Sequence, residues 1–309
     1  MVTVLTTTYN HERFIGDCIR SVQAQTFRDY EHIIIDDGST DGTADVVQSL
    51  MDEHTVFTSR SHVGIHRLSE TYNLGLQKAQ GEFIAILEGD DMYPRHKLEV
   101  QYDSMKNDDA VLSFGKAITV NAEHKVLGVA PNAKCFRGVT DWLTPLVVYD
   151  YIVSLTALIR RDALLKVGGF TQPPNTAYVD YSTFLELALI GKFKFIDEVL
   201  GIWVKHGNNY SDLNLYSNVY NKYSIQFCRK HNIPIPWEAL NKQRGKDYFH
   251  IGRHQLLAGN IKEAKRCFSE SFKLSPLFDK VKALGGLAFA LSHLDLENVA
   301  RGFNRPVER

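Results

Sequence analysis

Hydrophobic residues in the first ninety positions follow two alternating periods. Short apolar runs rich in β-branched residues predict buried strands. Between these runs the apolar residues recur with the spacing of an amphipathic helix, as Ile15, Ile19 and Val22 do after the first run. Such strands separated by helices imply an α/β fold whose mostly parallel sheet is covered by helices on both faces. The predicted strands lie at residues 2–6, 31–35, 54–60 and 82–87.

Polar residues gather where these predicted strands end. In sheets of this kind ligands bind beyond the carboxyl ends of the strands, so we expect a binding site there. The residues concerned are Thr7, Tyr9 and Asn10 after the first strand, Asp36 and Asp37 after the second, and Glu88, Asp90 and Asp91 after the fourth.

The pattern from about residue 136 to residue 211 is less regular. It is compatible with a helix, a buried strand at residues 153–159, and a second helix that stops at Gly168. A further helical stripe follows, and Asp180 stands near its start. The segment Asn232 to Trp237, with its two prolines, predicts a rigid connection to a separate helical tail.

The tail carries one unit that resembles a tetratricopeptide repeat. A single repeat cannot bury its own faces, so we expect it to pack on the rest of the chain or on another subunit of a homo-oligomer. The segment at residues 282–294 has the pattern of an amphipathic helix at a membrane surface, but a core or interface helix is the more frequent interpretation of such a pattern. The repeat positions are Tyr248, Ile251, Gly252, Gly259, Ala264, Phe268 and Pro276.

Composition and charge narrow the class of protein. With 309 residues, 44% hydrophobic, the chain can bury the core of one large or two modest domains. It lacks an apolar stretch of about 18 residues, which argues against a membrane span. Cys18, Cys135, Cys228 and Cys267 have no metal-ligand spacing, so we expect reduced thiols and a cytoplasmic protein. The basic balance of residues 241–309, 13 Lys/Arg against 7 Asp/Glu, leaves peripheral contact with the inner face of the membrane open.

The acidic strand end at residues 88–91 is the strongest chemical signal. The chain contains neither a G-x-x-x-x-G-K-[ST] segment nor a G-x-G-x-x-G after a strand, which excludes the usual phosphate cradles made of protein alone. Clustered carboxylates instead suit Mg²⁺ or Mn²⁺, which bridge protein carboxylates to substrate phosphates. The competing interpretation is a cap for the helix that follows.

Four segments in order along the chain carry a family resemblance. Together they resemble the family 2 glycosyltransferases, whose fold is the nucleotide-sugar-binding GT-A type, over residues 1–211. The resemblance implies donor binding by residues 1–116 and an acceptor side with the catalytic base at residues 117–211. Residues 212–240 are then a linker or helix, and residues 241–309 the tail. The segments are TTTYN at 6–10, DDGSTDGT at 36–43, GEFIAILEGDD at 81–91 and GGF at 168–170.

The resemblance places the nucleoside at the first two strand ends. It implies that Thr7 and Tyr9 flank the base and that Asp37, with Asp36 beside it, accepts the ring N–H. A carboxylate only accepts, so Asp37 suits the imide N–H of uracil or thymine rather than cytosine. A plain turn and helix cap is the other interpretation of the acids at residues 36–41.

The segment before the third predicted helix completes the expected donor site. Gly64 is assigned to nucleotide binding there. A cationic or donor side chain from His62, His66 or Arg67 is placed to touch phosphate, and the sequence does not choose between that role and a solvated loop.

The family's D-x-D element corresponds to Glu88, Gly89 and Asp90. Glu88 departs from the pattern by one methylene, which affects whether it reaches the ribose or the metal. We expect Asp90 to be the principal metal ligand, with Asp91 as an orienting or alternative one. Gly89 lets the backbone approach the diphosphate. His206 resembles a late position of the family that approaches the metal or diphosphate.

Asp180 corresponds to the position of the family's catalytic base. The family often has an acidic pair there, whereas the neighbour in this chain is Val179. One carboxylate is enough to take a proton from an acceptor hydroxyl. A cap for a helix starting near Ser182 is the alternative role for Asp180.

Taken together, these features predict an inverting, Mn²⁺- or Mg²⁺-dependent glycosyltransferase. It moves a sugar from a nucleotide diphosphate sugar, UDP-linked, to a saccharide or lipid-linked saccharide acceptor in surface polysaccharide or glycoconjugate synthesis, without nucleic acid as a partner. The same residues are compatible with two alternative functions. A nucleotidyltransferase would use a similar acidic metal site, and a non-catalytic scaffold would bind nucleotide while its tail recruits partners.

Overall fold

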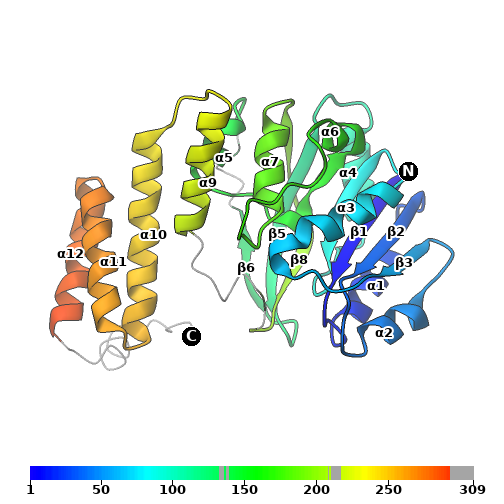
Figure 1. Ribbon diagram of the computed structural model, residues 1–309, viewed down its shortest axis with the longest axis horizontal. Helices are drawn as coiled ribbons and strands as arrows, with labels where there is room; N and C mark the ends of the chain where they lie inside the picture. The colour runs from blue at the N-terminus through cyan, green and yellow to red at the C-terminus, as the bar shows by residue number, and fades with distance from the viewer. Residues whose placement is uncertain (132–135, 137–138, 208, 210–216, 293–309) are drawn as a thin grey trace. The chain divides into compact units, whose positions relative to one another are not determined.

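The chain forms two compact units in a computed structural model that describes residues 1–131, 136, 139–207, 209 and 217–292 (Figure 1). One unit comprises residues 1–146 and 150–213, and the other residues 147–149 and 214–309. Each unit is described by itself below. The finer subdivision at residue 116 and the linker at residues 212–240 stay predictions.

A mixed, mostly parallel sheet forms the centre of the first unit. Its described part has eight strands in the order β3-β2-β1-β4-β7-β5-β6, with β8 also paired to β5. The pairs β3-β2, β2-β1, β1-β4 and β5-β8 are parallel, which confirms the predicted sheet. The strands are β1 (Val2–Thr8), β2 (Tyr30–Asp36), β3 (Thr55–Ser59), β4 (Phe83–Glu88), β5 (Leu112–Asn121), β6 (Val126–Ala130), β7 (Leu158–Arg160) and β8 (Phe193–Lys205).

The second half of the sheet differs from the sequence-based expectation. The strand predicted at residues 153–159 is wrong for most of its length, because Ser154–Thr156 form a 3₁₀ turn, η3. Only Leu158–Arg160 pair as β7, antiparallel to β4 and β5. The sequence pattern also missed β5, β6 and β8. Register shifts near Lys116 break the alternation between β5 and β8.

Helices cover both faces of the sheet. Val4 of β1 belongs to one core cluster with Ile19 and Leu98, which lie on helices after β1 and β4. On the other face, the helix that contains Gly75 packs closely on β1, because a methyl group added at Gly75 would lie 2.1 Å from Leu5 Cδ1. The helices are α1 (Ile15–Gln23), α2 (Thr43–Leu50), the 3₁₀ turn η1 (Ile65–Arg67), α3 (Leu68–Lys78), α4 (Lys97–Met105), α5 (Leu143–Val148), α6 (Arg161–Lys166) and α7 (Asp180–Ala188).

The strand register brings the polar strand ends together. Thr8 pairs with Asp36, and Thr7 pairs with Glu88, so β1 ends between β2 and β4. The next residues continue these contacts, because Asp37 N–H donates to Thr8 O at 2.9 Å and Gly89 N–H donates to Thr7 O at 2.9 Å. The predicted gathering of these residues at one edge of the sheet is therefore confirmed.

The second unit is helical. Phe268 on α11 is fully buried, and methyl groups added at Gly252 and Gly286 would lie 2.8 and 2.5 Å from its ring. These glycines let α10 and α12 pack against α11, although the resemblance to a tetratricopeptide repeat stays a prediction. The helices are α9 (Ser217–Lys230), α10 (Trp237–Leu257), α11 (Ile261–Leu274) and α12 (Leu277–Ser292).

The lengths and compositions of these helices bear on a membrane span. Within the residues that the structure describes, none of the helices combines the length and the apolar character needed to cross a bilayer.

Candidate active site

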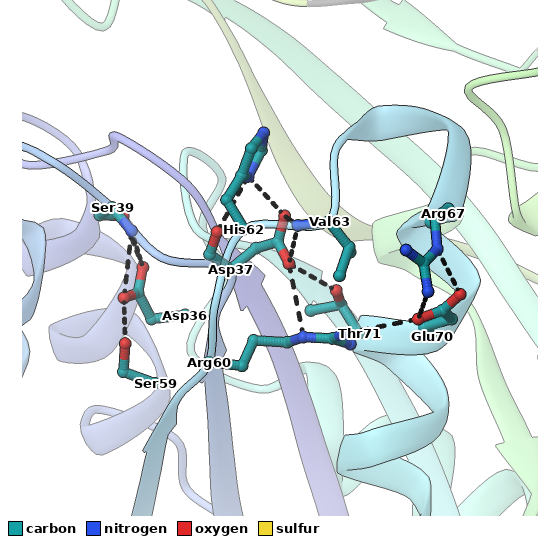
Figure 2. A network of polar contacts seen from close by, with 10 residues as sticks. All are labelled: Asp36, Asp37, Ser39, Ser59, Arg60, His62, Val63, Arg67, Glu70 and Thr71. Carbon is teal, nitrogen blue, oxygen red and sulfur yellow. Dashed lines mark hydrogen bonds and ion pairs between the residues drawn. The ribbon is translucent and has the colours of Figure 1, made fainter.

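Asp36 closes the turn at the end of β2. Its carboxylate is buried and accepts hydrogen bonds from Ser39 N at 3.2 Å and Ser59 Oγ at 2.8 Å, and the Ser39 hydroxyl donates to it as well (Figure 2). All of these donors belong to the turn and to β3. The structure thus gives Asp36 the turn-forming contacts, and its place in the nucleotide site stays a prediction.

Asp37 lies at the centre of a second, denser network. Thr71 Oγ1 donates to Oδ1 at 3.1 Å, His62 Nδ1 lies 2.8 Å from Oδ2, and Val63 N–H points between both oxygens at 3.4 and 3.3 Å. Arg60 Nε lies 3.8 Å from Oδ1. Figure 2 shows these groups converging on Asp37 from the loop after β3 and from α3. The carboxylate is therefore held in one orientation.

The rings of Tyr9 and His62 stack beside Asp37. Their centroids are 4.0 Å apart and their planes differ by 16°. Tyr9 stays 37% exposed, and its role beside a nucleotide base stays a prediction. Thr7, in contrast, is buried inside β1.

The structure separates the candidates of the segment before α3. His66 Nδ1 lies 3.1 Å from Thr176 O, and Arg67 forms two hydrogen bonds with Glu70 at 2.6 and 2.9 Å. His62 is thus the member of the three that contacts Asp37. Gly64 precedes η1 with a φ of +82°, a conformation that glycine adopts without strain.

Glu88, at the end of β4, is enclosed by its neighbours and only partly satisfied. Its Oε1 accepts from Tyr72 Oη at 3.0 Å and from Ser154 Oγ at 2.9 Å. Its Oε2 is buried without a hydrogen-bond partner in the described chain. Burial, together with the charges of Asp180 and Asp90, raises the pKa of Glu88 to about 7.

Asp90 has the opposite electrostatic setting. Its Oδ2 lies 3.0 Å from His206 Nε2, 3.3 Å from Asn209 Nδ2 and 3.9 Å from His11 Nε2. Burial would raise the pKa of Asp90, but the hydrogen bond from His206 and the attraction of both imidazoles hold it below its usual range. Asp90 is thus the carboxylate of the D-x-D element that stays charged.

Gly89 is required by its neighbours in the fold. A methyl group there would lie 2.6 Å from Thr8 Oγ1 and 2.9 Å from His11 Nδ1. The close approach that the structure shows is therefore to the loop after β1, and an approach to a diphosphate stays a prediction.

Asp91 faces β8. Its Oδ1 accepts a hydrogen bond from Val204 N–H at 2.8 Å, and the side chain is buried. Burial and the charges of Asp90 and Glu88 raise its pKa well above the usual value. This contact joins β4 to β8, and it gives no support to the prediction that Asp91 binds metal.

Asp180 is the first residue of α7. The residue before it, Val179, occupies the cap position, and Asp180 Oδ1 accepts from Tyr181 N–H at 2.9 Å. Burial raises the pKa of Asp180. The alternative of a cap for a helix beginning near Ser182 therefore does not describe this helix, which starts two residues earlier.

Asp150 is a second enclosed acid near Asp180, and it was missed from the sequence. Burial first, and then the charge of Asp180, raise its pKa well above the usual value. The surrounding segment is fixed by Tyr181 Oη, which donates to Leu146 O at 3.0 Å, and by the contact of Ser154 with Glu88. An isolated acid inside the apolar run at residues 146–155 is the signal that could have identified it.

His11 and Asn209 were also missed. Asn209 Nδ2 donates to Val204 O as well as to Asp90, and its Oδ1 accepts from His206 N–H at 2.8 Å. Asn209 thus orients both predicted metal-site residues. The Asn-rich segment HGNN at residues 206–209 was visible in the sequence, but its contact with residue 90 depends on the tertiary fold.

The arrangement fits a cation that is shared with a substrate. In the part of the chain that is described, no group of three or more His, Cys, Asp or Glu side chains is arranged to hold a metal by itself. Asp90 and His206 provide two potential metal ligands that contact each other. His206 Nδ1 is buried without a hydrogen-bond partner in the described part of the chain. Mg²⁺ and Mn²⁺ accept one or two protein ligands when phosphate oxygens complete the shell.

Comparison with known proteins agrees with this geometry. The chain is similar to Pasteurella multocida chondroitin synthase, 27% identical over 251 residues, which are 80% of this chain and 24% of that protein. Its fold is similar to Staphylococcus aureus TarS 1–349 in complex with UDP-GlcNAc (TM-score 0.63, 14% identity, 99% of this chain and 93% of that one). It is also similar to the mannosyltransferase PcManGT of Pyrobaculum calidifontis in complex with GDP-Man and Mn²⁺ (TM-score 0.59, 20% identity, 94% and 80%).

These structural neighbours confirm the expected GT-A fold. The chain spans only about a quarter of the length of the chondroitin synthase, so that relative's whole activity cannot be transferred to it. The model of glycosyl transferase family 2 matches residues 3–168, more than half of the sequence. The chain therefore belongs to glycosyl transferase family 2 and is a glycosyltransferase.

Proposed function

We propose that the enzyme transfers a hexose-type sugar from a UDP-sugar to a hydroxyl acceptor, with inversion at the anomeric carbon and with Mn²⁺ or Mg²⁺. One observation carries this proposal. At the end of β4 a charged carboxylate, Asp90, lies beside Glu88, whose pKa is raised in part by the charge of a separate enclosed carboxylate, Asp180. Groups whose surroundings push their pKa values apart suit different chemical roles.

The nucleoside half of the proposal rests on Asp37 and Tyr9. Asp37 is held so that it can only accept hydrogen bonds, and the imide of uracil offers the matching N–H. The exposed ring of Tyr9 provides a surface on which a base can stack. The TarS complex contains UDP-GlcNAc, which supports the same donor class for this chain.

The cation half rests on Asp90 and His206. These two side chains would hold the metal, and Asn209 would orient them. When bound, a divalent cation neutralises the diphosphate of the leaving nucleotide. PcManGT was solved with Mn²⁺, which supports a metal of this class here.

Asp180 takes the role of general base in this proposal. Its raised pKa makes it, when ionised, a better proton acceptor than an ordinary carboxylate. It accepts the proton of the acceptor hydroxyl as the oxygen forms a bond to the anomeric carbon. The bond from that carbon to the diphosphate oxygen breaks, and its electron pair leaves with UDP.

The biological setting is also part of the proposal. Similarity to a chondroitin synthase supports polysaccharide or glycoconjugate synthesis, with a saccharide or lipid-linked saccharide as acceptor. We place the enzyme in the cytoplasm. A lipid-linked acceptor would bring it into contact with the inner face of the membrane. Cys18, Cys228 and Cys267 are free buried thiols, which supports a reducing compartment.

A donor screen tests the proposed function. The purified chain is incubated with UDP-, GDP-, ADP-, CDP- and dTDP-linked sugars and either Mn²⁺ or Mg²⁺, and the released nucleotide is measured. We expect slow, metal-dependent release of UDP from a UDP-sugar even without acceptor. Release of pyrophosphate would identify a nucleotidyltransferase, and turnover of only non-UDP donors would contradict the UDP donor. Turnover of only CDP- or ADP-linked sugars, whose bases have no ring N–H on that edge, would contradict the assignment of Asp37.

A further inference from the structure

His62 makes two contacts of the kind that the base of the donor is proposed to make. Its ring stacks on Tyr9 at 4.0 Å. Its Nδ1 lies 2.8 Å from Asp37 Oδ2 and 3.0 Å from the carbonyl oxygen of Asp37 (Figure 2). Both of these oxygen atoms are acceptors, so Nδ1 must carry the hydrogen. His62 therefore presents a flat ring and an adjacent N–H to the same two residues.

Three donors already occupy the carboxylate of Asp37. Its Oδ1 accepts from Thr71, its Oδ2 accepts from His62, and Val63 N–H is shared between them. The Arg60 guanidinium lies at 3.8 Å on the Oδ1 side. A carboxylate offers about four acceptor positions in all, and three of them are in use. A ligand N–H can bind Asp37 Oδ2 in the place that His62 Nδ1 occupies only by replacing His62.

Among those donors His62 is the replaceable one. Val63 donates through its backbone and Thr71 is fully buried on α3, so both have less room to move away from Asp37 than an exposed side chain has. The Arg60 side chain is 22% exposed and also pairs with Glu70 at 3.4 Å. The His62 side chain is 44% exposed, and its ring is held by Tyr9 and Asp37.

The backbone at His62 is held in place, which confines any movement to the side chain. A methyl group at Gly38 would lie 2.7 Å from His62 N and 2.8 Å from Arg60 O, so the turn after β2 runs directly against this segment. The φ of Gly38 is +77°, which glycine adopts without strain. The ring can leave Tyr9 by rotating about its own side-chain bonds.

We propose that His62 is a further residue of the donor site, where its ring holds the place of the nucleotide base until the base displaces it. Rings stacked at 4.0 Å leave no layer between them, so a base cannot insert while His62 is in this position. The displacing group must offer a flat face and a ring N–H, which an imide base such as uracil provides. This inference rests on the proposed function and deepens it by adding an internal competitor to the UDP site.

The competition predicts that a substitution in the binding site increases the affinity for UDP instead of decreasing it. If most unliganded molecules have His62 on Asp37, the measured affinity is reduced by the fraction that is open. His62→Ala removes the competitor, so we expect UDP to bind about three- to tenfold more tightly. His62→Phe keeps a stacking ring but loses the N–H, and its affinity should lie between those of the wild type and His62→Ala.

Titration calorimetry of UDP with Mn²⁺ on the full chain tests the proposal, with His54→Ala as the matched control. His54 also stacks on a tyrosine, Tyr30, and its Nδ1 lies 3.0 Å from Tyr30 O, but it precedes β3, at the opposite end of these strands from Asp37. Its replacement should therefore leave the UDP affinity within about twofold of the wild type. His62→Ala that binds UDP equally or more weakly would overturn the inference, whereas the proposed donor would stand. A wild type that binds no UDP would contradict the proposed donor and the inference together.

Discussion

The two ends of the candidate site treat their carboxylates in different ways. At the nucleoside end, Asp36 and Asp37 are surrounded by hydroxyl, backbone and imidazole donors. At the transfer end, Glu88, Asp150 and Asp180 are enclosed with few donors, and no ion pair links them to a cation within the described residues.

The two ends thus differ in whether their carboxylates are already compensated by hydrogen-bond donors. Carboxylates that already have their donors keep a fixed shape before any ligand arrives. Enclosed carboxylates without compensation have raised pKa values, as Glu88, Asp150 and Asp180 do, and they become favourable as anions only when a cation or substrate joins them. The carboxylates of the nucleoside end are thus fixed in advance, with His62 in the place proposed for the base, and we propose that the substrate completes the transfer end.

The largest expected effect is at Asp180. Asp180→Asn should reduce sugar transfer by about 10²- to 10⁴-fold, because the amide cannot accept the proton of the hydroxyl, while UDP affinity stays within about twofold. Transfer is measured with a donor identified by the screen. Asp162→Asn is the matched control: Asp162 also lies in the first turn of a helix and accepts from the next backbone N–H, at 2.7 Å. Equal losses in both variants would show that Asp180 acts only through the start of its helix and not as the base.

The next effect concerns the charged member of the transfer end. Asp90→Asn should weaken UDP binding in the presence of Mn²⁺ on the order of tenfold to hundredfold and change it little in the presence of EDTA, because only the metal-linked part is lost. Calorimetry in both conditions measures this difference. The same loss with and without metal would show that Asp90 supports the fold and not a cation.

A third test uses the pH dependence of stability at Asp150. Its pKa is raised in the folded state, so its contribution to stability is present below about pH 4, where both states are protonated, and is lost as the pH rises through the folded value. Asp150→Asn keeps an acceptor for Ile152 N–H but cannot ionise. Between pH 4 and pH 8 we expect the unfolding free energy of the variant to rise relative to the wild type by about 1.4 kcal/mol or more. This is the free energy that corresponds to a tenfold difference in proton affinity between the folded and unfolded states.

Asp141 offers a control of opposite sign. Hydrogen bonds from Thr144, which outweigh burial, hold the pKa of Asp141 below its usual range. Asp141→Asn should therefore lose stability relative to the wild type as the pH rises from acid toward neutrality, because the wild-type carboxylate is stabilised once it ionises. Urea unfolding at acid and neutral pH measures both variants, and the same sign in both would remove the electrostatic difference between these two acids.

The smallest expected effect is at the prepared nucleoside end. Ser59→Ala removes one donor from buried Asp36 and should cost about 1 kcal/mol of unfolding free energy near neutral pH. Ser49→Ala, whose exposed hydroxyl contacts Val46 O, is the control and should be close to neutral. Equal stability of the two variants would show that the donors around Asp36 do not hold the turn.

The sequence was sufficient for features that are local or that follow from parallel pairing. Asp37, Glu88 and Asp90 each follow an apolar run, and parallel strands place such ends at one edge, so their proximity could be predicted. The run at residues 153–159 was misleading, because the Thr156 hydroxyl bonds to Val153 O and Ser154 turns toward Glu88, which favours a 3₁₀ turn over a strand.

Contacts that arrive from distant elements could not be predicted in the same way. Asn209 reaches Asp90 from a position 119 residues away, and Asp150 approaches Asp180 through a segment without regular periodicity. β8 was missed because Asp197 and Glu198 lie at the register shift and interrupt its apolar alternation. These features depend on tertiary packing, which no local pattern encodes.

The central claim is that the transfer end needs a divalent cation to accept a nucleoside diphosphate. Its most direct test is the UDP dissociation constant of the wild-type chain with Mn²⁺ and with EDTA, measured by titration calorimetry near neutral pH. We expect the metal to tighten binding on the order of tenfold or more, because Asp90 and His206 would supply only two of its ligands and the diphosphate would supply others. Equal affinity in both conditions would contradict the account.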